Sequence, residues 1–110
     1  MAGKIVAEVS VIPIGTGNTG LSHFIAACLD AIENRKGISY QLTPMGTVLE
    51  GNLQDVFEAI QAMHEAPFSR GASRVVTWVK IDDRRDKQST MASKIESVLK
   101  LQQSSRSDKK

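Results

Sequence analysis

Two kinds of hydrophobic spacing alternate along this chain, and their order constrains the fold more than any other feature of the sequence. Apolar residues at every second position predict strands with one buried face, and those three and four apart predict helices with one buried face. The strand-like segments are 4–14, 38–43, 47–50 and 74–82. The helix-like segments are 21–32, 53–66 and 91–99.

The predicted order is therefore β-α-β-β-α-β with one further helix at the end. The first six elements form two βαβ halves joined by a hairpin, which is the α+β, ferredoxin-like plan with a four-stranded antiparallel sheet. Right-handed crossovers place both main helices on one face of that sheet. A chain of 110 residues has room for one domain, predicted over 1–102, followed by a polar, disordered tail over 103–110.

Local signals set the expected ends of the helices. Thr19, Asn52 and Thr90 each have the side chain of a helix N-cap and precede a helical stripe. Gly37 is expected to stop the chain from continuing the first helix, and Pro67 is expected to end the second helix at Ala66.

Composition excludes several classes of function. Fourteen Lys and Arg residues against twelve Asp and Glu residues give a net charge of only +2, and four of the basic residues lie in the last eleven positions, which argues against nucleic-acid binding. A single cysteine excludes an internal disulfide and a multi-cysteine zinc site. No apolar run approaches the ~20 residues that cross a bilayer. We expect a soluble, cytoplasmic protein without membrane contacts.

One face of the predicted sheet has no helix to cover it. Strand alternation places an apolar set on that face: Val6, Ile12, Val48, Val76 and Trp78. Together they make a larger apolar patch than a monomer usually exposes. Either a second copy associates through this open face or the third helix folds across it, and the pattern favours association.

Motifs for catalysis, metals and cofactors are weak. The segment GTGNTG over 15–20 matches a dinucleotide fingerprint, but the following strand has no carboxylate for the ribose. We interpret it as a turn that needs positive φ angles, with weak anion binding as the alternative. Cys28 lies on an apolar helix stripe, and His23 and His64 lie in different helices. The run of charged residues over 82–87 indicates a solvated loop. No catalytic residue, metal site or cofactor is predicted.

The polar residues on the open face have two possible roles, one structural and one in ligand binding. Glu8 and Ser10 share a strand face with apolar residues, and Glu50 ends the short strand. The carboxylates either pair with Lys4, Lys80 or Arg74 across the sheet, or contribute to a small-molecule site beside Trp78 that a second subunit closes.

Three sequence blocks carry a resemblance to a known family. They are S-x-x-P at Ser10 and Pro13, T-x-M-G-T-x-x-E-G from Thr43 to Gly51, and I-D-x-R-x-D from Ile81 to Asp86. In this order they resemble the YkoF-like, thiamine-binding family of small ferredoxin-like proteins, over about residues 4–99.

The resemblance implies binding of thiamine or its hydroxymethylpyrimidine moiety without catalysis. It also implies homo-oligomers, either dimers or tetramers that are dimers of dimers, formed through the open sheet face. Ser10, Thr43, Thr47 and Glu50 occupy the motif positions nearest to the implied ligand site. Trp78 and Glu8 are added from strand phase as a stacking partner and a carboxylate.

Two other functions remain open from the sequence alone. One is a small cofactor-free enzyme that uses His23 or the pair Arg84 and Asp86. The other is a structural or regulatory oligomer without a small ligand.

Overall fold

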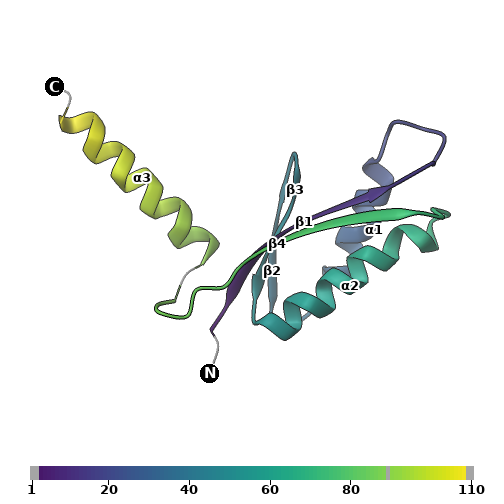
Figure 1. Ribbon diagram of the computed structural model, residues 1–110, viewed down its shortest axis with the longest axis horizontal. Coiled ribbons are helices and arrows are strands. Elements are labelled where there is room, and N and C mark those ends of the chain that lie inside the picture. The colour runs from purple at the N-terminus through teal and green to yellow at the C-terminus, as the bar shows by residue number, and fades with distance from the viewer. Residues whose placement is uncertain (1–2, 89, 109–110) are drawn as a thin grey trace.

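The computed structural model describes residues 3–88 and 90–108, and it has the predicted order of elements (Figure 1). The strands are β1 (Ile5–Pro13), β2 (Ile38–Thr43), β3 (Gly46–Gly51) and β4 (Val75–Asp82). The helices are α1 (Ser22–Ile32), α2 (Leu53–Ser69) and α3 (Met91–Asp108). The fold is α+β, ferredoxin-like with an added C-terminal helix, as predicted.

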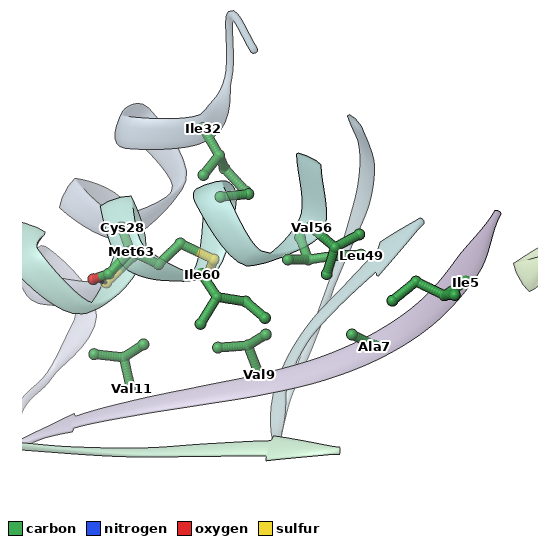
Figure 2. Packing of buried hydrophobic residues seen from close by; sticks show 11 residues of the cluster. Ile5, Ala7, Val9, Val11, Cys28, Ile32, Leu49, Val56, Ile60 and Met63 are labelled. Atoms are coloured by element: carbon green, nitrogen blue, oxygen red, sulfur yellow. Dashed lines mark hydrogen bonds between the residues drawn. The ribbon is translucent and has the colours of Figure 1, made fainter. Parts of the chain in front are cut away.

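The four strands form one antiparallel sheet in the order β2-β3-β1-β4. The central strand β1 alternates as its sequence predicts, with Ile5, Ala7, Val9 and Val11 each no more than 4% exposed. In Figure 2 the labelled side chains of β1 point toward the helices, where they meet Ile60 and Met63 of α2. This single core lies between α1, α2 and one face of the sheet.

The pairing register of β1 with β3 and β4 confirms which residues lie on the open face. Residues paired across antiparallel strands share a face, and Ser10 is opposite Trp78 while Ile12 is opposite Val76. In the next rows Glu8 lies between Val48 and Lys80, and Val6 lies between Glu50 and Asp82. Trp78 is 69% exposed.

The predicted cap of α1 at Thr19 is wrong. The helix begins after Leu21, and no side chain caps it. The polar groups of the preceding loop form hydrogen bonds with one another instead. The Gly20 amide donates to Asn18 Oδ1 at 2.8 Å, and the Thr16 hydroxyl donates to the Asn18 carbonyl at 3.0 Å. The prediction that the loop needs positive φ is confirmed at Gly15 and Gly17. Asn52 and Thr90 do cap α2 and α3.

The predicted end of α2 at Ala66 is also wrong, because Pro67 lies inside the helix, which continues to Ser69. Proline has no N–H, so the Met63 carbonyl one turn earlier loses its helical donor. The Cys28 thiol of α1 donates to that carbonyl instead, with an Sγ–O distance of 3.3 Å. Figure 2 shows the two residues side by side. A tertiary contact therefore satisfies the group that the proline leaves free.

The helix α3 extends away from the rest of the molecule (Figure 1). It runs through Asp108, so residues 103–108 are helical where the sequence predicted a disordered tail, and 109–110 lie outside the described residues. The segment is rich in Gln and Ser without Gly or Pro, and nothing in it ends a helix once one has started. Across the described residues, no helix is both long and apolar enough to cross a membrane.

Candidate functional site

A cavity of about 710 Å³ lies between α1, the second half of β1 and the β2–β3 turn. Ligand pockets in proteins typically enclose roughly 300–1,000 Å³. Four of the residues predicted from the sequence line it: Ser10, Thr43, Thr47 and Trp78. The residues that the sequence analysis missed include Ile25, Leu29, Leu42, Met45 and Met63. They come from α1, β2, α2 and the β2–β3 turn, and only tertiary packing brings them together.

The cavity exists because the pairing of β1 with β3 stops early. The ladder ends at Val9, opposite Thr47, while β1 continues to Pro13. From Ser10 onward, the edge of β1 on this side has no strand opposite it in that ladder. An unpaired strand edge offers backbone donors and acceptors to a bound molecule. The cavity passes this edge, so its lining includes Val11 on the helix-covered face and Trp78 on the open face.

Hydroxyl groups hold the β2–β3 turn at the mouth of the cavity. Thr43 Oγ1 donates to the Gly46 carbonyl at 2.8 Å and accepts from the Met45 and Gly46 amides at 3.3 and 3.1 Å. Ser10 Oγ donates to the Met45 carbonyl at 3.0 Å and so ties β1 to the turn. Thr43 therefore has its hydrogen-bonding capacity used within the turn, whereas Ser10 keeps lone pairs for a ligand.

Gly46 lets the turn approach β1 closely. A Cβ at this position would lie 2.9 Å from Ser10 Oγ and 3.0 Å from the Val9 carbonyl oxygen. The T-x-M-G-T sequence thus has a structural explanation. Thr43 holds the turn by hydrogen bonds, Gly46 leaves room for β1, and Thr47 follows directly.

That second threonine, Thr47, is not beside Glu50 as the sequence analysis grouped it. Thr47 points to the helix-covered face and is 3% exposed, whereas Glu50 points to the open face. Thr47 and Glu50 are three positions apart in β3, and strand alternation puts such residues on opposite faces of the sheet. Thr47 lines the cavity from inside, and Glu50 is outside its lining.

The two predicted carboxylates lie at different distances from the cavity mouth. Glu8 Cγ is 3.6 Å from the point where a Cβ of Gly46 would be, so Glu8 borders the rim. Glu50 lies opposite Val6 in the sheet. Val6 is four positions before Ser10 along β1, so Glu50 lies about 13 Å along the strand direction from Ser10. Among the described residues neither carboxylate takes part in an ion pair, although Glu8 lies opposite Lys80.

Cys28 lines the inner wall of the cavity as a protonated thiol. Burial raises the pKa of this thiol from 9.0 to about 11, and the side chain is 1% exposed. A reactive cysteine needs a lowered pKa and access to solvent, so Cys28 serves as a small apolar group with a weak donor, as predicted.

This raised pKa predicts a loss of stability in alkaline solution. The unfolded chain releases the thiol proton near pH 9 and the folded chain only near pH 11, so the free energy of unfolding should fall as the pH rises between these values. The loss attributable to Cys28 is up to about 2–3 kcal/mol. Urea unfolding of the wild type and of Cys28→Ser at about pH 8 and pH 10.5 measures this loss. Cys28→Ser is the control because serine keeps a hydrogen-bond donor to the Met63 carbonyl but does not ionise in this range. An equal loss in both proteins would contradict the assignment.

None of the residues of the enzymatic alternative, His23, Arg84 and Asp86, is part of the cavity lining. His23 is exposed, and the His64 Nδ1 is 2.7 Å from Thr77 Oγ1 in a structural contact between α2 and β4. Arg84 Nε donates to Asp86 Oδ1 at 2.6 Å, and this hydrogen bond lowers the pKa of the Asp86 carboxyl. Arg85 pairs with Asp83 in the same way. The run is a salt-bridged, exposed loop, in which these hydrogen bonds from arginine lower the pKa values of the Asp83 and Asp86 carboxyls.

The chemical character of the cavity follows from its lining. Among the described residues that line it, none is an acid, a lysine, an arginine or a histidine. Apolar walls with hydroxyls from Ser10 and Thr47 suit a neutral, flat molecule with a few polar atoms. An ionised group would lose its hydration there without a partner charge. In addition, no cluster of His, Cys, Asp and Glu side chains that could hold a metal ion occurs within residues 3–88 and 90–108.

Sequence comparison identifies relatives that this chain matches over most of their length. The chain is 51% identical over 98 residues to the UPF0045 protein YqgV of Bacillus subtilis, which covers 86% of this chain and 94% of that protein. It is 44% identical over 95 residues to a UPF0045 protein of Methanothermobacter thermautotrophicus, covering 86% and 95% of the two chains.

Solved structures share the fold. MJ1052 of Methanocaldococcus jannaschii superimposes with a TM-score of 0.78 at 33% identity, over 86% of this chain and 95% of that one. TM0486 of Thermotoga maritima, named provisionally as a thiamine biosynthesis/salvage protein, superimposes with a TM-score of 0.68 over 86% and 98% of the two chains. At 21% identity the second likeness concerns the fold alone. The family model described as thiamine-binding protein matches residues 7–99, and the chain therefore belongs to that family.

Proposed function

We propose that this protein binds thiamine or its hydroxymethylpyrimidine moiety without transforming it, with the pyrimidine ring inside the cavity. The observation that carries the proposal is the uncharged, largely apolar cavity with hydroxyl groups in its wall, in a chain of the thiamine-binding protein family. The provisional name of the Thermotoga maritima protein is consistent with this ligand class.

The hydroxyl groups match the polar atoms of an aminopyrimidine. Its exocyclic amine donates hydrogen bonds and its ring nitrogens accept them. Ser10 Oγ already donates to Met45 and is left as an acceptor for the amine. Thr47 can donate to a ring nitrogen from the inner wall. The Thr47 contact would form away from bulk water, because this side chain is 3% exposed, and a missing hydrogen-bond partner is costly there.

The thiazolium ring of thiamine requires a different environment. It is a permanent cation, so we place it at the cavity mouth, between the Glu8 carboxylate and the indole face of Trp78. Cation–π attraction to a tryptophan is worth about 1–2 kcal/mol when the cation is desolvated. The proposed binding mode therefore separates a neutral inner half of the ligand from a charged outer half.

Replacing the carboxylates tests this division. Glu8→Gln should weaken thiamine binding by ~1.5–3 kcal/mol, roughly 10- to 150-fold, because a charge-assisted contact is lost, while the affinity for the neutral pyrimidine should stay the same. Glu50→Gln is the matched control on the same face. A larger effect of Glu50→Gln on affinity would support the sequence-based prediction for Glu50 and contradict our placement of the thiazolium.

Association belongs to the same proposal. The open face carries Trp78 and the half-buried side chains of Val6, Ile12, Val48 and Val76, and we propose that a second copy covers it, in a dimer or a dimer of dimers. The cytoplasmic location expected from the sequence stays a prediction.

Titration calorimetry with hydroxymethylpyrimidine, thiamine and thiamine diphosphate tests the proposed function. We expect the first two to bind with dissociation constants below about 1 mM and to be recovered unchanged. Absence of binding by all three would contradict a thiamine-related function. Consumption of a ligand during incubation would instead support the enzymatic alternative.

A further inference from the structure

The helix α3 presents an apolar stripe that nothing covers within the described residues. Ile95, Val98 and Leu99 recur at helical spacing one turn after Met91, and Leu101 borders them. Ile95, Val98, Leu99 and Leu101 are each more than half exposed. A helix with such a stripe ordinarily packs it against another surface.

The open face of the sheet is the second uncovered apolar surface, and the two match in size. From Met91 to Leu101 the stripe spans eleven residues, and its ends are about 15 Å apart at the rise of an α-helix. Four strands spaced ~4.8 Å apart make a sheet about 14 Å wide between its outer strands. One helix can therefore cross the whole sheet.

The charges on the two surfaces permit the contact. Asp82 of the open face and Lys94 of α3 already pair with each other within one chain. The open face then keeps Glu8 and Glu50 against Lys80, and α3 through residue 105 keeps Glu96 and Lys100, which pair with each other one helical turn apart. The apolar stripe can therefore meet the apolar centre of the face without an excess of negative charge on the helix.

The start of α3 directs the helix away from its own sheet. Thr90 Oγ1 accepts from the Ser93 amide at 3.0 Å and Ser93 Oγ donates back to Thr90, which fixes the first turn. Lys94 forms an ion pair with Asp82 at the end of β4, which anchors this turn to the sheet. From that anchor the helix points outward (Figure 1), where it can reach a second molecule.

We propose that α3 of one copy lies across the open face of a second copy, which returns the same contact. This inference rests on the association proposed above and specifies what covers the face. A reciprocal exchange has twofold symmetry and buries two helix–sheet contacts instead of one, which helps it to reach the roughly 1,200–2,000 Å² of a stable interface. Because Ser10, Ile12 and Trp78 also line the cavity, the α3 of the partner closes its outer mouth.

The single tryptophan of the chain makes this exchange measurable. The test mixes two full-length variants. Trp78→Glu has a disabled face, an intact α3 and no tryptophan. Ile95→Glu/Leu99→Glu has a disabled α3 and an intact face with Trp78. Each variant alone should scatter light as a single chain of 12.0 kDa. On mixing, we expect a heterodimer and a saturable blue shift of Trp78 emission, because the intact helix of one variant covers the face of the other.

The control adds Ile95→Glu/Leu99→Glu to the Trp78→Glu chain, which should abolish the blue shift. A wild-type protein that is a single chain would overturn the inference, whether its own α3 covers Trp78 or Trp78 stays exposed. If Ile95→Glu/Leu99→Glu alone remains a dimer with blue-shifted emission, the sheets associate directly, and the exchange is wrong although association through the open face is right.

Discussion

Replacing Thr47 by valine is expected to weaken binding of hydroxymethylpyrimidine by ~1–3 kcal/mol, roughly 5- to 150-fold, without loss of stability. Thr47 is 3% exposed and faces the interior of the cavity. Valine keeps the branched shape and removes the hydroxyl, so the free energy of unfolding should stay the same or rise, because no hydroxyl is buried. A ligand that hydrogen-bonds to Thr47 would lose its partner in a site with little water. Calorimetry and urea unfolding of the same preparation measure both quantities.

Thr77 offers a matched control for this substitution. It lies opposite Val11 on the helix-covered side of β4, outside the cavity lining, and its hydroxyl is 2.7 Å from His64 Nδ1. Thr77→Val should therefore lower stability and leave affinity unchanged, the reverse of Thr47→Val. If both variants bind the pyrimidine as the wild type does, the ligand does not use the inner wall of the cavity.

Replacing Trp78 by glutamate is expected to convert the associated protein into single chains. Trp78 is the largest apolar side chain on the open face and is 69% exposed in the isolated chain. A glutamate at that position would bury an unpaired charge in the contact, which costs several kcal/mol and weakens association by at least about 100-fold. Light scattering at a chain concentration where the wild type is associated measures the change.

Gln61→Glu is a suitable control, because it adds the same charge at an exposed position of α2, away from the open face. It should leave the oligomer intact. A Trp78→Glu protein with the same mass in solution as the wild type would show that association, if present, does not involve this face.

The fold was predictable because each segment has one dominant period. The alternation in 4–14 and 74–82 also determined which side chains face away from the helices, and the register confirms the position of Trp78 beside Ser10. One error lies where a tertiary contact replaces a local one: Pro67 stays in its helix, where Cys28 satisfies the Met63 carbonyl, and a donor from another helix leaves no local signal in the sequence. The other lies before α1, where hydrogen bonds within the loop take the place of a cap by Thr19.

The cavity could be predicted only in part. Motif positions pointed to Ser10, Thr43 and Thr47, but its volume depends on where the β1–β3 ladder ends and on how far α1 lies from the sheet. Neither follows from hydrophobic spacing. Strand phase alone would have separated Thr47 from Glu50, since positions 47 and 50 differ by an odd number.

The methionine methyl groups give the most direct test of the cavity as the ligand site. Met63 is 2% exposed and lies in the inner wall, Met45 is at the mouth, and Met91 is on α3. In a protein with ¹³C-labelled methionine methyls, added hydroxymethylpyrimidine should shift the Met63 and Met45 resonances and leave Met91 in place, with assignments from Met→Leu variants. Saturating ligand that leaves the Met63 resonance unmoved would contradict binding in this cavity.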